Sequence, residues 1–219
     1  MTHRPSLYAL LLLALTLPWA GPTLATASLF DNLGQDGDNA TGITNDQWAA
    51  QGFTTTADAV MVTEVAAALF SEAPTSGTFA MEIWNMASGA PGTKVADVFS
   101  GDASLLVSST FAKTGLSLTL SPLTDYFLVV KGISLDASSN VQWRYAEAAG
   151  GTGLPSPFVQ TTNAGVNWST PSQETPQKMR IAAATDVPVP PVPALLAIGL
   201  AGLRLTRRRS RSPAGAASL

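Results

Sequence analysis

Residues 116–130 read LSLTLSPLTDYFLVV, the pattern of two β-strands joined by a turn. Leu116, Leu118 and Leu120 alternate with serine and threonine, which is the period of a strand with one buried face. Residues 126–130 are apolar at every position, as expected for a central strand. This stretch therefore predicts a sheet-forming chain.

The turn between these two strands resembles the tyrosine corner of sandwich domains. Pro122 shapes the turn, and the hydroxyl of Tyr126 can bond to the backbone a few residues upstream. The feature predicts structure and carries no chemistry of its own.

The same two-residue period recurs along the body of the chain. It is clearest at residues 78–84, 141–145 and 178–181. Further strand candidates, bounded by turn residues, are 52–56, 60–70, 95–99, 105–111 and 158–161. About ten short strands without βαβ alternation predict an all-β fold. We expect an antiparallel two-sheet β-sandwich, jelly-roll-like, over residues 28–186.

Four segments of the body resemble the choice-of-anchor domains of exported bacterial proteins, most nearly the R type. They are residues 50–55 (AQGFTT), 77–84 (GTFAMEIW), 89–92 (GAPG) and 121–130 (SPLTDYFLVV). Trp143 and the late strand at 178–181 fit as well. The resemblance implies a sandwich fold and export, and it adds no catalytic residue.

Residues 1–27 have the parts of a secretory signal peptide with an N-terminal signal helix. Arg4 supplies the positive charge, residues 7–17 are apolar, and Ala25 and Ala27 fit the small-x-small cleavage pattern. The apolar segment is shorter than the roughly 20 residues that a membrane span needs. We therefore expect signal peptidase to cleave after Ala27, so that the mature chain begins at Ser28.

Residues 187–219 form a tail of three parts. A proline-rich motif comes first: Val187, Pro188, Val189, Pro190 and Pro191. A short apolar helix is expected over residues 194–203, about 15–18 Å long against a hydrocarbon core of roughly 30 Å. The basic cluster that follows consists of Arg204, Arg207, Arg208 and Arg209. Such a cluster should stay on the cytoplasmic side, which leaves the body outside.

This order of proline motif, apolar helix and arginine cluster resembles the PEP-CTERM sorting signal. In that family an integral-membrane transpeptidase-like enzyme, an exosortase, cleaves near the proline motif. Here Pro188-Val189-Pro190 replaces the Pro-Glu-Pro of the family, and residues 212–219 follow the last arginine. The resemblance implies processing by an exosortase-like enzyme. A plain C-terminal membrane anchor is the alternative.

The formal net charge of −3 over 219 residues hides an uneven distribution. All 15 acidic residues lie within residues 31–186. Six basic residues share that stretch: Lys94, Lys113, Lys131, Arg144, Lys178 and Arg180. An acidic body argues against a nucleic-acid partner, because phosphate binding needs clustered cations.

The residue types present exclude several kinds of active site. Cysteine is absent, and the single histidine, His3, lies in the expected signal peptide. The mature domain therefore lacks Ser-His-Asp and Cys-His catalytic sites and metal sites of histidine or cysteine. No phosphate-binding loop motif is present. We expect no catalytic residue and no cofactor.

Two kinds of binding residue remain. Trp48 and Trp168 lie in loop-like surroundings and are candidates for stacking on a ligand, whereas Trp84 and Trp143 lie in alternating segments and are expected in the core. Asp36 and Asp38 belong to a glycine-rich segment with oxygen ligands, which is a candidate for calcium. An Asx-rich turn without a metal is the alternative there.

These observations leave three hypotheses for function. The first is a non-catalytic protein of the cell surface or extracellular matrix, exported and sorted through its tail, with a biofilm role implied only by the exosortase resemblance. The second is a carbohydrate-binding module acting on extracellular polysaccharide. The third is a glycoside-active enzyme, for which Glu64, Glu82 and Asp97 are the candidate carboxylates, since such a pair must lie about 5–10 Å apart.

Overall fold

A computed structural model describes six ranges of the chain: residues 25–71, 75–107, 109–147, 151–153, 157–172 and 175–185. They belong to one compact unit, Ala25–Thr185. The expected signal helix, the proline motif, the apolar helix and the arginine cluster lie outside the described residues. Within the described ranges, the structure contains no helix long and apolar enough to span a membrane.

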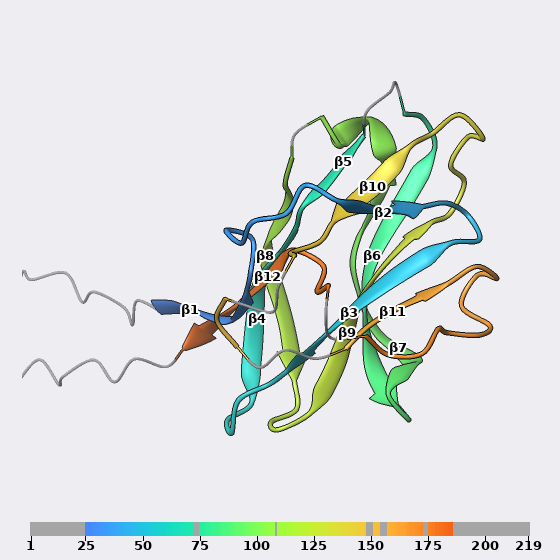
Figure 1. Cartoon of the computed structure of the whole chain (residues 1–219). Coiled ribbons are helices and arrows are strands. Elements are labelled where there is room, and N and C mark those ends of the chain that lie inside the picture. Colours follow the sequence, from blue (N-terminus) through green and yellow to red (C-terminus); the bar gives the residue numbers. More distant parts are fainter. Residues whose placement is uncertain are drawn as a thin grey trace, which may run out of the picture. The chain divides into compact units, whose positions relative to one another are not determined.

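The described residues form strands and one short 3-10 helix (Figure 1). The strands of the first half are β1 (Ala25–Asp31), β2 (Ala40–Ile43), β3 (Trp48–Thr54), β4 (Val60–Ala67), β5 (Leu69–Ser71) and β6 (Thr78–Ala87). Those of the second half are β7 (Ala90–Asp102), β8 (Phe111–Leu120), β9 (Asp125–Gly132), β10 (Val141–Arg144), β11 (Phe158–Thr161) and β12 (Met179–Thr185). The 3-10 helix η1 covers Ala103–Leu105.

The fold is all-β, with three antiparallel sheets. One sheet has the order β1-β12-β4-β8, the second β2-β10-β5, and the third β11-β3-β9-β6-β7. Among the strands that the structure describes, only β6 and β7 are neighbours both in sequence and in a sheet, joined by a two-residue turn at Ser88 and Gly89. Both turn residues have positive φ, which is the geometry of a type I′ hairpin and the reason a glycine suits the second position.

One hydrophobic core collects side chains from all three sheets. On β9, Tyr126, Leu128 and Val130 point into this core, whereas Phe127 and Val129 belong to a second cluster on the opposite side of the strand. The continuous apolar run thus becomes a strand buried on both faces, as the sequence predicts. Trp143 on β10 is fully buried, which confirms its expected place in the core.

The tyrosine corner is present. The backbone N–H of Ser121 donates to the hydroxyl of Tyr126 over 3.1 Å, five residues upstream of the ring. Thr55 completes the corner, because its hydroxyl accepts from the N–H of Thr124 at 2.9 Å and donates to the carbonyl of Ser121 at 2.7 Å. The turn before β9 is thereby tied to the end of β3.

A cycle of hydrogen bonds joins the four-stranded sheet to the three-stranded sheet. The N–H of Lys178 donates to Arg144 O at 2.8 Å, that of Arg144 to Ala68 O at 3.0 Å, and that of Ala68 to Lys178 O at 3.0 Å. The indole Nε1 of Trp143 also donates to Lys178 O, at 2.8 Å. Ala68 separates β4 from β5. At this break the chain passes from the four-stranded sheet, which contains β4, to the three-stranded sheet, which contains β5.

The prediction of a strand over residues 105–111 is wrong. The carboxylate of Asp102 accepts the N–H of Ser104 at 2.7 Å and so caps η1, which ends at Leu105. Strand β8 begins only at Phe111, the last residue of the expected strand. The single strand expected over residues 60–70 is divided at Ala68. Two strands, β1 and β2, lie where the sequence predicted none.

Replacing Trp143 by phenylalanine should test the junction between the sheets. The change leaves a void in the core and removes one donor from Lys178 O, so the free energy of unfolding should fall by about 2–4 kcal/mol in urea denaturation. Trp168→Phe is the control, because that ring is half-buried outside this core. A loss at Trp143 no larger than at Trp168 would show that the junction does not depend on the indole.

Candidate functional site

The outward side of the five-stranded sheet carries a second group of apolar residues. Four are fully buried in its floor: Ala50 on β3, Phe127 and Val129 on β9, and Val159 on β11. Four half-buried side chains pack over them: Trp48, Trp84, Met86 and Trp168. We call these four side chains the aromatic face. Ligand-binding surfaces commonly combine such rings with a few polar groups.

Trp48 is held by the turn that begins β3. Its Nε1 donates to Asn45 O at 2.9 Å, and Thr44 Oγ1 accepts the N–H of Gln47 at 2.9 Å within the same turn. The ammonium of Lys131 lies 4.8 Å from the centre of the Trp48 ring, a cation–π distance. The ring therefore has a fixed orientation and a charged neighbour.

Trp84 does not lie in the main core, so the prediction that it is a core residue is wrong. Successive side chains of a strand point to opposite faces, so Met81 and Ile83 enter the core while Glu82 and Trp84 point outward. The Nε1 of Trp84 donates to Glu82 Oε2 at 2.8 Å. Trp84 is thus a third ring beside the two tryptophans that the sequence nominated.

Trp168 comes from the segment 162–172, which follows β11. Asn163 shapes this segment, since its Oδ1 accepts from Thr161 Oγ1 at 2.7 Å and from the N–H of Asn167 at 2.9 Å. Gly165 has φ +84, and a Cβ there would come within 2.7 Å of the Trp48 ring. At the other end, Pro171 lies near Gly89 at the tip of the β6–β7 hairpin. The segment therefore crosses the sheet face from Trp48 towards the hairpin.

A chain of charges lies next to the rings. The buried carboxylate of Glu82 is 2.9 Å from Lys131 Nζ and 3.6 Å from Lys94 Nζ, and Lys94 is 2.8 Å from Asp97. Lys94 hydrogen-bonds to Asp97 and holds the pKa of that exposed carboxyl below its ordinary value of 3.8. The same bond to Asp97, followed by the charge of Glu82, raises the pKa of Lys94. Both oxygens of Glu82 are engaged.

The three candidate carboxylates do not form one group. Glu82 and Asp97 are cross-strand neighbours on β6 and β7. Glu64 lies on β4 in another sheet, where it pairs with Arg180 of β12. A general acid needs a raised pKa, and the pKa of Asp97 is lowered.

Protein cations bind the oxygens of the segment that contains Asp36 and Asp38. Lys178 Nζ donates to Gly37 O at 2.7 Å, and Arg144 NH1 contacts the Asp38 carboxylate at 2.7 Å. Asp36 offers its backbone carbonyl to the N–H of Glu147. In the described part of the chain, no group of three or more His, Cys, Asp or Glu side chains could hold a metal ion.

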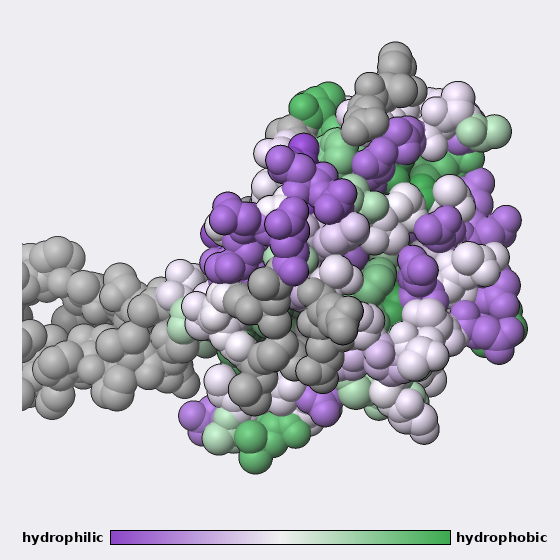
Figure 2. Space-filling view, viewed as in Figure 1, coloured by the Kyte–Doolittle hydropathy of each residue, from purple (hydrophilic) through white to green (hydrophobic). Residues whose placement is uncertain are grey.

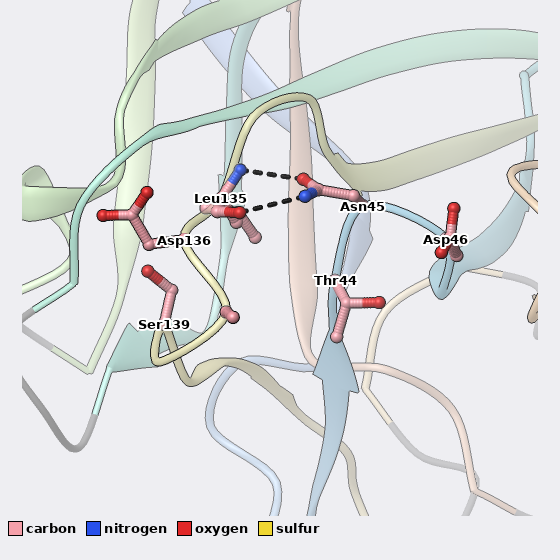
Figure 3. A pocket seen from close by; sticks show the side chains of 7 residues that line it. Thr44, Asn45, Asp46, Leu135, Asp136 and Ser139 are labelled. Atoms are coloured by element: carbon pink, nitrogen blue, oxygen red, sulfur yellow. Dashed lines mark hydrogen bonds between the residues drawn. The ribbon is translucent and has the colours of Figure 1, made fainter.

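A pocket of about 140 Å³ lies where the turn before β3 meets the loop between β9 and β10 (Figure 3). The side chain of Asn45 donates to Leu135 O at 2.9 Å and accepts from the Leu135 N–H at 2.8 Å. Asp46 and Asp136 stand on opposite sides of it, and Ser76 donates to Asp136. Both polar atoms of the Asn45 amide are bonded to the backbone of Leu135. The role of this side chain is therefore to tie the turn before β3 to the loop between β9 and β10.

Figure 2 shows one face of the molecule, on which hydrophobic residues form small, separate patches among hydrophilic ones. Isolated patches of this kind are normal on protein surfaces. The aromatic face differs, because its rings share one floor.

The chain matches no protein-family model and no curated protein.

Replacing Lys94 by methionine should raise the pKa of Asp97 towards 3.8, because the hydrogen bond that lowers it is lost. NMR titration of the Asp97 carboxyl carbon measures this directly. Since the folded pKa is the lower one, the contribution to stability is present above the unfolded pKa and disappears as the pH falls through the folded value. Lys113→Met, at an exposed position on β8, should leave the titration of Asp97 unchanged. An unmoved Asp97 pKa in Lys94→Met would contradict the assignment.

Replacing Lys178 by methionine should lower the free energy of unfolding by about 1–3 kcal/mol, because Gly37 O loses a charged donor at a partly buried position. Millimolar calcium should not restore the loss, as measured by thermal unfolding. Lys113→Met serves again as the control for removal of a lysine charge. Recovery of stability with calcium would instead favour the metal site at Asp36 and Asp38.

Proposed function

We propose that this chain is an exported, non-catalytic protein of the cell surface or extracellular matrix. In this proposal its β-domain is a jelly-roll-like sandwich, with the five-stranded sheet as one layer and the other two sheets as the second. The shared core supports this arrangement. So do the many pairings between strands distant in sequence, which are typical of Greek-key connections.

The observation that carries the proposal is the pairing of β1 with β12. Ser28, the expected first residue of the mature chain, is opposite Ala182, and Phe30 is opposite Ile181, in neighbouring strands at one edge of the four-stranded sheet (Figure 1). The two ends of the described domain therefore lie side by side at this edge. In this proposal the sorting tail is joined to the domain at the end of β12, next to the start of the mature chain.

This geometry also suggests an order for processing. Ala25 and Ala27, the residues expected at the signal cleavage site, belong to the edge strand β1. In the folded domain they are hydrogen-bonded to β12, which hinders a peptidase. We propose that signal peptidase cuts before β1 and β12 pair. An exosortase-like enzyme then acts on the tail, and a retained tail that simply anchors the protein is the alternative.

The absence of a catalytic role is part of the proposal. The one buried carboxylate beside the aromatic face, Glu82, is bound through both oxygens to Lys131 and Trp84. Using it as a base would break both contacts. A second candidate function, carbohydrate binding, is favoured by the three tryptophans of the aromatic face.

Intact-mass spectrometry tests the proposal on the full chain expressed in a host that carries an exosortase system. We expect loss of residues 1–27 and a second cut near Val187, Pro188, Val189, Pro190 or Pro191. Replacing Ala25 and Ala27 by arginine should block the first cut, and replacing Arg207, Arg208 and Arg209 by serine should impair the second.

The possible outcomes separate the hypotheses. A mature chain that begins at Ser28 but keeps its tail in the inner membrane would identify a plain anchor. A chain that keeps residues 1–27 and stays in the cytoplasm would rule out export.

A further inference from the structure

The rings of the aromatic face pack over a fully buried apolar floor. It consists of Ala50, Phe127, Val129 and Val159. Because each ring covers this floor and is only half-buried, part of its surface meets solvent. Exposed ring surface above a sheet is large, rigid and apolar, which suits stacking against the C–H face of another molecule.

Two of the rings are better placed for stacking than the third. The Trp48 ring already faces Lys131 and the backbone of Gly165. Trp84 is fixed by its bond to Glu82, and Trp168 by the segment that Asn163 shapes. Fixed rings lose little conformational entropy when a ligand binds.

The charges beside the rings balance one another. Glu82 and Asp97 face Lys94 and Lys131, so this group has no net charge. The other basic residues of the body are Lys113, Arg144, Lys178 and Arg180, and the last three are bound to Asp38, Gly37 and Glu64 respectively. The body has 15 acidic residues in all, so a polyanion would meet repulsion without a cluster of cations to bind it.

We propose that the aromatic face binds a neutral, hydroxyl-rich polysaccharide, with Trp84 and Trp168 stacking on sugar rings and the exposed Lys94 and Asp97 bonding to hydroxyls. Partly exposed rings that share one floor suit a chain of sugars, because successive sugar rings can stack on them. The inference deepens the proposed function, on which it rests for the presence of extracellular polysaccharide. Binding by the purified protein is nevertheless independent of how the chain is exported or cut.

Affinity electrophoresis of the full-length protein, purified from whichever fraction it accumulates in, tests this inference. The gels contain hydroxyethyl cellulose, xyloglucan, galactomannan or dextran as neutral probes, and alginate as the anionic one. We expect retardation by at least one neutral polymer and none by alginate. Trp84→Ala and Trp168→Ala should each weaken binding about tenfold or more.

Three comparisons keep the result interpretable. Trp84→Phe and Trp168→Phe retain a ring and should keep most of the affinity even where an alanine variant fails to fold. Leu123→Ala removes a strongly exposed apolar side chain from the turn before β9 and should bind as the parent does. Urea unfolding establishes that each variant is folded.

Several results would overturn the inference: no retardation by any neutral probe, retardation by alginate alone, or unchanged affinity in both folded alanine variants. Mass spectrometry of the same preparation reports export and sorting separately. A failed binding test and a failed sorting proposal therefore remain distinguishable.

Discussion

The backbone of Lys178 is the point on which the rest of the structure depends. Its N–H binds Arg144 O, and its carbonyl accepts from Ala68 and from the indole of Trp143. Buried backbone groups must find partners, and here Ala68, Arg144 and Lys178 supply them to one another. The cycle thereby fixes the start of β12 next to β10 and the break between β4 and β5, which links the four-stranded sheet to the three-stranded one.

Buried polar side chains extend this junction to the beginning of the chain and to the five-stranded sheet. Asn32, just after β1, accepts the N–H of Met179 at 2.7 Å and donates to Gln177 O at 3.1 Å. Gln51 on β3 accepts the N–H of Gln177 at 2.8 Å. Buried amides of this kind satisfy backbone that leaves its ladder, so the entry to β12 is fixed from both sides. The closure that brings both ends of the domain to one edge thus has a defined physical origin.

Alternation of side chains accounts for most of what the sequence could predict. It places Leu128 and Val130 in the core, and it identifies Trp143 as a core residue. The same rule places Trp84 on the outward face, because Met81 and Ile83 point inward. The prediction that Trp84 is a core residue did not follow this rule. The face of a tryptophan in a strand is therefore decided by the parity of its neighbours, whatever its own hydrophobicity.

Long-range pairing is what the sequence could not reveal. β1 pairs with a strand some 150 residues later, and its short ATASLFD stretch overlaps the expected cleavage site, so local pattern argues against a strand there. The segment 162–172 has no strand pattern and acquires its place only because Asn163 turns it and Gly165 fits against Trp48. Hydrogen bonds between residues far apart in the chain leave no local signature.

Most basic side chains of the body bind partners within the domain, whereas most of its acidic side chains face solvent. Five of the six basic side chains of the body contact a partner within the domain: Lys94, Lys131, Arg144, Lys178 and Arg180. These cations stabilise particular loops and strands, including the glycine-rich segment that resembles a calcium loop in composition. Among the acidic residues that the structure describes, most are exposed and in no ion pair with a lysine or arginine: Asp36, Asp46, Asp58, Asp102, Asp125, Asp136 and Glu147. A surface of this kind repels polyanions, which agrees with the proposal that the ligand of the aromatic face is neutral.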